Sequence, residues 1–317
     1  MAADHAHAHP HHHHHGVSAD SDRRRLLVAL TLIVAYMAVE VVVGLIVDSL
    51  ALLADAAHML TDAGALALSL VALRLAARPA EGNLTFGLKR AEILSAQANG
   101  ATLLVLGVLI AYEGIHRLLD PPAPLGLPIL AVALAGIPVN LAATWQLARA
   151  NRESLNIEGS FQHLLTDLFA FVATAIAGGV ILATGFDRAD AIASLLIATT
   201  MIVAAVRLLR DSGRILLEIA PAGMDVTEIG RALAAHQGVV EVHDLHLWEI
   251  SSGFPALSAH VLVEPGADCH AIRAVLERIL DEGFSIDHTT LQVDHASRGG
   301  LLQIGQRPLG TPDATGR

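Results

Sequence analysis

The first two thirds of the chain alternate between long apolar runs and short polar connections. The apolar runs cover residues 26–47, 51–75, 93–116, 125–148, 161–184 and 189–209. A helix needs about 20 apolar residues to cross a bilayer, and each run reaches that length. The pattern therefore predicts an α-helical polytopic membrane domain with six transmembrane helices.

After residue 213 the unbroken apolar runs give way to shorter segments. Residues 225–236 and 268–282 have helical periodicity, whereas 239–250, 256–264 and 289–294 alternate or are rich in β-branched residues, as strands are. This order predicts a small cytoplasmic α+β domain, αββαβ, in which two helices cover one sheet. We therefore expect a membrane domain at 23–212 and a soluble domain at 213–297.

The two terminal segments have no pattern that could form a core. Residues 1–22 begin with a run rich in histidine and alanine, and residues 298–317 are rich in glycine and proline. Such segments bury too little apolar surface to fold, so both are predicted to be disordered tails. The histidines of the first tail, among them His5, His7 and His9, either chelate metal or belong in part to a purification tag.

Composition and charge agree with a membrane protein, since 53% of the 317 residues are hydrophobic and 16% are charged. Most arginines and lysines lie in the connections on the same side of the membrane as the amino terminus, whereas Arg117 and Arg188 lie on the opposite side of the membrane. The positive-inside rule then predicts a multi-pass protein of the inner (plasma) membrane with both termini cytoplasmic. The net charge of −11 gives no support for a nucleic-acid partner. One cysteine, Cys269, excludes an internal disulfide framework.

Ionisable side chains interrupt the second apolar run at Asp55, His58 and Asp62. Each costs about 2.5–3.5 kcal/mol near the centre of a bilayer, so the three need a compensating partner. The fifth run repeats the pattern, because HLLTDLFAFVA at 163–173 matches HMLTDAGALAL at 58–68. Residues four apart share one face of a helix, so His58 with Asp62, and His163 with Asp167, each form a two-pronged ligand pair.

Two such pairs facing each other would supply two imidazole nitrogens and two carboxylate oxygens around one point. This set suits tetrahedral Zn²⁺, whose charge balances the two carboxylates. Asp55 either holds the His58 imidazole in one tautomer or lines the path of entry. Other polar side chains at membrane depth are predicted to pack between helices: Glu40, Gln97, Asn99 and Asn140.

The ligand set favours a transporter over an intramembrane metalloenzyme or a metal-sensing membrane protein. Catalytic zinc usually keeps three protein ligands and an open position, whereas this set supplies four. The common His-Glu-x-x-His pattern of metallohydrolases is also missing. With the metal removed, two carboxylates and two histidines in a low dielectric should take up protons, which predicts exchange of metal for H⁺.

Four stretches together resemble the cation diffusion facilitator family, in particular its zinc-exporting branch. They are SLALLADAAHMLTD (49–62), RPAEGNLTFGLKRAEIL (78–94), HLLTDLFAFVA (163–173) and VVEVHDLHLWEISSG (239–253). The resemblance implies six membrane helices, a metallochaperone-like cytoplasmic domain, a homodimer, and Zn²⁺/H⁺ antiport. It also assigns transported metal to His58, Asp62, His163 and Asp167.

The resemblance further implies regulatory Zn²⁺ between the cytoplasmic domains of two protomers. His243, His260 and Asp294 occupy the matching positions, whereas Gln292 replaces a histidine of some members, which leaves the number of metals open. His246, His270, His288 and His295 could substitute or could be solvated. In the loop between helices two and three, Glu81, Leu84 and Leu88 stand where some members hold a metal, so we expect no site there. Arg90 and Glu218 match a charge pair of relatives.

Overall fold

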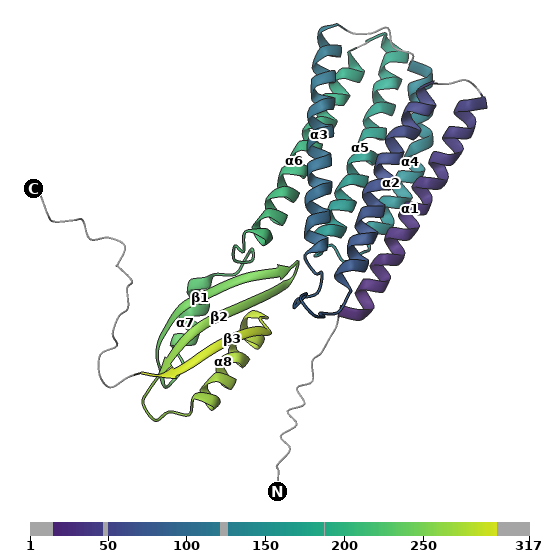
Figure 1. Cartoon of the computed structure of the whole chain (residues 1–317). Helices are drawn as coiled ribbons and strands as arrows, with labels where there is room; N and C mark the ends of the chain where they lie inside the picture. The colour runs from purple at the N-terminus through teal and green to yellow at the C-terminus, as the bar shows by residue number, and fades with distance from the viewer. Residues whose placement is uncertain (1–14, 47–49, 121–125, 187, 297–317) are drawn as a thin grey trace, which may run out of the picture. The chain divides into compact units, whose positions relative to one another are not determined.

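The computed structural model describes residues 15–46, 50–120, 126–186 and 188–296. The long helices of the first part of the chain form a bundle (Figure 1). They are α1 (His15–Ile46), α2 (Leu50–Ala76), α3 (Ala91–Leu119), α4 (Gly126–Ala148), α5 (Leu155–Thr184) and α6 (Ala189–Leu216). Within them, side chains at 15–20, 40, 43–44, 50–58, 61, 126–129 and 132 lie outside the description. Among the described residues, α3, α5 and α6 are long and apolar enough to cross a membrane.

All six predicted helices are present, but three extend beyond the apolar runs that revealed them by six or more residues. Helix α1 begins at His15, inside the segment expected to be a disordered tail, α5 begins at Leu155, and α6 continues to Leu216. The extensions carry polar residues that pack: Asp22 is 6% exposed and its carboxylate accepts the backbone N–H of Asn151 at 2.9 Å. Hydropathy alone locates the apolar centre of a helix, whereas packing decides where the helix ends.

Two apolar clusters hold the bundle together. The larger one joins α1, α2, α4 and α5, and the smaller one joins α3 to α6 through Leu103, Met201 and Ala205. Glycines at positions 100, 107 and 114 form a row without side chains on the face of α3 that packs against α6. A Cβ at Gly107 would lie 3.0 Å from Ile202 Cγ1. Small residues of this kind let helix backbones approach closely in membranes.

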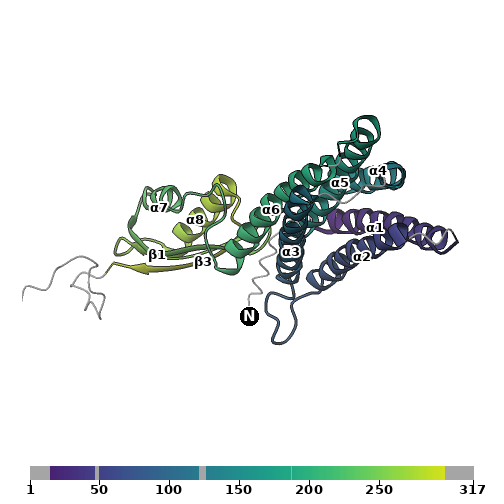
Figure 2. The same cartoon turned by 90° about the horizontal axis from the view of Figure 1, so that it is seen from above.

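The cytoplasmic domain contains α7 (Val226–Ala234), β1 (Val239–Ser251), β2 (Phe254–Val263), α8 (Cys269–Phe284) and β3 (His288–His295). The sheet order is β1-β2-β3, and β2 pairs in parallel with β3 so that His260 lies opposite Gln292. Both helices lie on one face of the sheet (Figure 2). Leu257, Val261 and Leu276 are among the buried residues that fill the space between the layers. The predicted αββαβ order and two-layer architecture are confirmed.

The chain separates into two compact units, and the boundary falls between Ile219 and Ala220. This is several residues after position 213, where the sequence pattern changes, because α6 remains helical through the arginine-containing turn at Arg214. The first unit also includes the tip of the β1–β2 hairpin, Glu249–Phe254. Within that unit, the backbone N–H of Ser252 donates to Glu92 Oε1 at 3.2 Å.

Candidate metal centre

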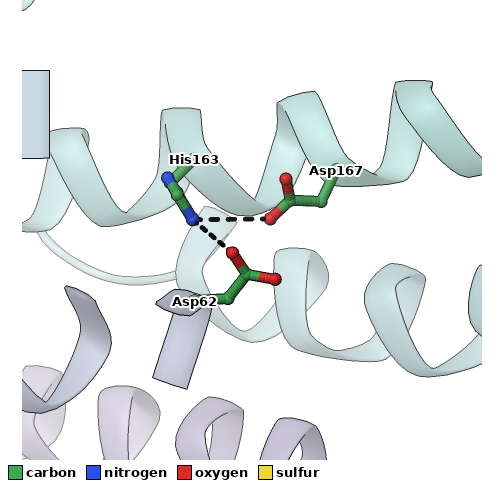
Figure 3. Close-up of side chains that lie close together, drawn as sticks. All are labelled: Asp62, His163 and Asp167. Carbon is green, nitrogen blue, oxygen red and sulfur yellow. Dashed lines mark hydrogen bonds and ion pairs between the residues drawn. The ribbon is translucent and has the colours of Figure 1, made fainter. Parts of the chain in front are cut away.

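Three of the four predicted membrane ligands meet between α2 and α5. Nε2 of His163 lies 2.8 Å from Asp62 Oδ1 and 3.8 Å from Asp167 Oδ2 (Figure 3). One ligand atom from each of the three residues lies within 4.8 Å of the other two. Among the described residues, no other group of three or more histidine, cysteine or acidic side chains is this close.

The secondary structure explains how each side chain reaches this point. His163 and Asp167 are four residues apart on α5, so they lie on the same face one turn apart, and Asp62 reaches them from α2. The exposed fractions are only 4% for Asp62, 2% for His163 and 5% for Asp167. Bulk water therefore does not solvate these charges, and a buried carboxylate needs a cation or a proton as partner.

The two nitrogens of the His163 imidazole have different surroundings. Nε2 points between the two carboxylates, whereas Nδ1 is buried and has no hydrogen-bond partner among the described residues. An imidazole nitrogen and a carboxylate oxygen at 2.8 Å both have lone pairs, so a proton must lie between them when no metal does. The space between Nε2 and the two carboxylates is thus the position that a proton or a divalent cation would occupy.

The fourth predicted ligand, His58, has a side chain outside the described residues, as has Asp55. The backbone of residue 58 is part of α2, one turn before Asp62, so the two residues share one face of that helix. Its position in the helix is compatible with the predicted four-ligand set, and its contribution stays a prediction.

Polar residues predicted to pack between helices have different partners. Asn99 is 2% exposed and donates to Ser69 Oγ at 3.2 Å, from α3 to α2. Asn140 is equally buried but donates at 3.4 Å to the carbonyl of Gly136 on its own helix. The side chain of Glu40 lies outside the described residues, and that of Gln97 is partly exposed.

Ser69, Asn156 and Ser160 form part of the same buried group as Asn99, and the sequence did not single them out. Serine and asparagine carry no charge and are common between membrane helices, so their presence gives little signal without the contacts. One signal was available: Asn156 and Ser160 lie four residues apart, so they share one face of the helix in the two turns before His163.

The predicted cytoplasmic ligands are only partly brought together within one chain. The rings of His243 and His260 lie 5.4 Å apart between centroids, with His260 Nε2 at 4.0 Å from Asp244 Oδ2. Asp294 instead accepts from Gln292 Nε2 at 2.8 Å. The set of His243, His260 and Asp294 therefore stays a prediction. The alternatives are spread over the domain: His246 contacts Asp244 at 3.1 Å, and His295 contacts Cys269 Sγ at 3.3 Å.

The predicted charge pair is formed, because Arg90 Nη2 lies 3.1 Å from Glu218 Oε1. In the loop between α2 and α3, Glu81 and Leu84 form an isolated β-bridge through their backbones.

Comparison with known proteins gives two family matches that together cover most of the chain. Residues 26–217 match the model of the cation efflux transmembrane domain, and residues 221–296 match the cytoplasmic domain of cation efflux proteins. The division between the matches agrees with the boundary between the two compact units.

Several curated proteins are similar over nearly the whole chain. The zinc transporter ZitB of Escherichia coli is 37% identical over 274 residues, which are 86% of this chain and 87% of the relative. A cadmium, cobalt and zinc/H⁺-K⁺ antiporter of Bacillus subtilis is 35% identical over 276 residues, 86% of this chain and 89% of the relative.

A solved structure matches the cytoplasmic part. It is the metal-bound C-terminal domain of the CzcD transporter from Cupriavidus metallidurans, 30% identical, covering 22% of this chain and 99% of the solved domain, with a TM-score of 0.22.

Proposed function

Because this chain belongs to the cation efflux family, we propose that it exports Zn²⁺ from the cytoplasm in exchange for protons. The buried contact of Asp62, His163 and Asp167 between two membrane helices is the observation that carries the proposal. Relatives are named as zinc transporters and as a cadmium, cobalt and zinc/H⁺-K⁺ antiporter, which supports divalent metal as the cargo. Cd²⁺, Co²⁺ and Ni²⁺ are further candidates for transport.

The donor set favours Zn²⁺ among divalent ions. With His58 as the fourth ligand, two imidazole nitrogens and two carboxylate oxygens would complete a tetrahedral site of the kind zinc prefers. The two carboxylates would balance the charge of the ion, which offsets much of the cost of burying all three charges. Mg²⁺ and Ca²⁺ prefer six or more oxygen ligands, so nitrogen donors disfavour them.

Proton exchange follows from the position of His163 Nε2. The 2.8 Å contact with Asp62 requires a proton between the two atoms, and a metal ion bound by both of them requires that proton to leave. Binding of the ion therefore releases at least one proton, and arrival of protons from the other side of the membrane displaces the ion. A pH gradient can then drive export.

The remaining partners and the orientation are part of the same proposal. The match to the cytoplasmic domain of cation efflux proteins supports a homodimer. The neighbouring rings of His243 and His260 are candidates for a regulatory Zn²⁺. The distribution of arginine and lysine supports an inner-membrane protein with both termini in the cytoplasm.

The test is transport in sealed liposomes that contain a zinc-sensitive dye, with and without an imposed pH gradient. We expect Zn²⁺ flux that rises with the pH gradient, and its loss in Asp167→Asn, which keeps the shape of the side chain but removes a charged ligand. The matched control is Asp120→Asn, a change at an exposed carboxylate after the end of α3. Zinc flux that ignores the pH gradient would contradict antiport, and zinc binding without flux would indicate a sensor.

A further inference from the structure

A layer of four buried polar side chains joins three helices of the bundle. The hydroxyl oxygens of Ser69 on α2 and Ser160 on α5 are hydrogen-bonded at 2.7 Å. Nδ2 of Asn99 on α3 donates to Ser69 Oγ at 3.2 Å, and Nδ2 of Asn156 on α5 donates to the Ser69 carbonyl at 2.9 Å. None of the four is more than 2% exposed. We call Ser69, Asn99, Asn156 and Ser160 the polar layer.

The polar layer stands between the candidate metal centre and one end of the bundle. On α5, Asn156 and Ser160 precede His163, and on α2, Ser69 follows Asp62 by two turns, roughly 10 Å along the helix axis. Helix α2 ends and helices α3 and α5 begin at this same end of the bundle (Figure 1). In the proposed orientation this end faces the cytoplasm, so an ion that moves between the cytoplasm and the metal centre meets the polar layer.

Among the described residues, two oxygen atoms in and next to the layer have no hydrogen-bond partner. Asn156 Oδ1 is buried with no hydrogen-bond partner among the described residues, and so is the hydroxyl oxygen of Ser95, one turn before Asn99 on α3. A network that only joins helices is most stable when all its polar atoms are paired. Water donates hydrogen bonds to oxygen lone pairs, and partly hydrated divalent cations are coordinated by them. These atoms are therefore suited to receive a passing ion.

Asn140 illustrates the purely structural alternative. It is as buried as Asn99, but its amide donates to the carbonyl of Gly136 on α4 itself, and it has no contact with the polar layer in the described hydrogen bonds. Interhelical hydrogen bonds commonly stabilise membrane bundles. The polar layer differs in that it connects the two helices that carry the predicted metal ligands, and in that Asn156 Oδ1 has no hydrogen-bond partner among the described residues.

We propose that the polar layer is the gate on the path between the cytoplasm and the metal centre. The bond between Ser69 and Ser160 holds α2 against α5 and closes the path. When these helices separate, the hydroxyl and amide oxygens replace part of the hydration shell of a Zn²⁺ ion on its way to Asp62 and His163. This inference rests on the proposed transport of Zn²⁺ and on the proposed orientation.

The first experiment separates passage from binding with Asn156→Leu in the full-length protein. A leucine has the same branched arrangement of heavy atoms as asparagine, and it removes the amide oxygen and the Nδ2 donor to Ser69 without changing the metal ligands. We expect Zn²⁺ flux into liposomes to fall roughly tenfold or more, while the equilibrium affinity for Zn²⁺ in detergent changes less than about twofold. Asn140→Leu is the matched control and should keep its flux.

Normal flux in Asn156→Leu would overturn the gate, and so would a parallel loss of affinity and flux, because the residue would then support the metal centre itself. If Asn156→Leu does not fold, Ser69→Ala replaces it in the same comparison, because it removes the hydroxyl that is hydrogen-bonded to Ser160. An unchanged flux in Ser69→Ala would also overturn the gate. Absence of flux in the unaltered protein would instead refute the proposed transport.

The second experiment tests from which side the polar layer is reached. In a Cys269→Ser background, Ser160→Cys carries the only thiol of the chain. We expect a membrane-impermeant methanethiosulfonate reagent to label it from the cytoplasmic face, and saturating Zn²⁺ to change the rate several-fold. Labelling from the opposite face alone, or none from the cytoplasmic face while transport is running, would overturn the assignment.

Discussion

At the scale of single residues, His163 is the position at which proton and metal compete in the proposed mechanism. Its Nε2 faces Asp62 and Asp167 together, and its burial removes water as a third competitor. Substitution of any ligand changes both the charge of the centre and the number of donors. The identity of the ligands should therefore decide which metal is carried.

We predict that His58→Asp lowers the preference for Zn²⁺ over Mn²⁺. The change replaces an imidazole nitrogen by a carboxylate oxygen, and harder oxygen ligands favour Mn²⁺. The ratio of Zn²⁺ to Mn²⁺ flux in liposomes should fall roughly tenfold. The same substitution at His116, near the end of α3 and exposed, serves as the control. An unchanged ratio would show that selectivity is set away from this ligand.

At the scale of elements, small residues set how closely the helices approach. Gly136 on α4 faces Phe171 on α5, and a Cβ at this position would overlap the phenyl ring. Gly64 on α2 is exposed, and a Cβ there would meet no atom within 4 Å. The two glycines therefore differ in packing although both lie inside membrane helices.

We predict that Gly136→Ala destabilises the bundle by about 1–3 kcal/mol, because the added methyl forces α4 away from α5. Thermal unfolding of the purified protein in detergent measures the effect. Gly64→Ala is the matched substitution and should be neutral or stabilising by up to about 1 kcal/mol, since alanine is the better helix former. Equal stability of the two variants would contradict the close packing of Gly136.

The helix caps of the cytoplasmic domain give a pH prediction. The pKa of Asp225 lies below its usual range, chiefly because the backbone N–H groups of Thr227 and Glu228 donate to its carboxylate at the start of α7. Because the pKa of Asp225 is lower in the folded state than in the unfolded state, the ionised carboxylate stabilises α7 when the pH is above the unfolded pKa of about 3.9. This stabilisation is lost as the pH falls through the folded pKa.

We expect Asp225→Ala to speed hydrogen exchange of the α7 amides several-fold at neutral pH in the full-length protein. Asp225→Asn should retain most of the protection, because asparagine is also a good cap. The difference between the aspartate and the alanine proteins should shrink at pH 3, whereas a constant difference across pH would argue against the carboxylate.

At the scale of the whole molecule, Arg90 and Glu218 join the start of α3 to the residues that follow α6. Glu218 has a φ of 56°, which a non-glycine residue adopts only at a cost, so the surrounding structure holds it there. The side chains are 41% and 61% exposed, so the pair should contribute no more than about 1 kcal/mol to stability. The expected role of the pair is therefore to position the connection that leads to the cytoplasmic domain.

We predict that Arg90→Glu and Glu218→Arg each reduce Zn²⁺ flux, and that the double exchange restores most of it. The reversed pair can reform the same contact with opposite polarity, whereas each single change places like charges together. Flux and protein stability are measured on all four proteins. Additive losses in the double variant would remove the pair from the mechanism.

Local patterns in the sequence predicted the helices and strands and the residue types of the candidate metal centre. Apolar runs predicted six helices because crossing a bilayer demands length and hydropathy in one continuous segment. Alternation and β-branching predicted the αββαβ order for the same local reason. The repeated His-x-x-x-Asp spacing identified His163 and Asp167 as neighbours because helical periodicity alone places them on one face.

Contacts between distant segments were decided only by the tertiary structure. The bond from Asp62 to His163 spans 101 positions, and that from Ser69 to Ser160 spans 91. The amino-terminal extension of α1 packs through Asp22, which accepts the backbone N–H of Asn151, and hydropathy does not register this contact. The polar layer could therefore be recognised only from the fold, because its serines and asparagines are linked by hydrogen bonds between different helices.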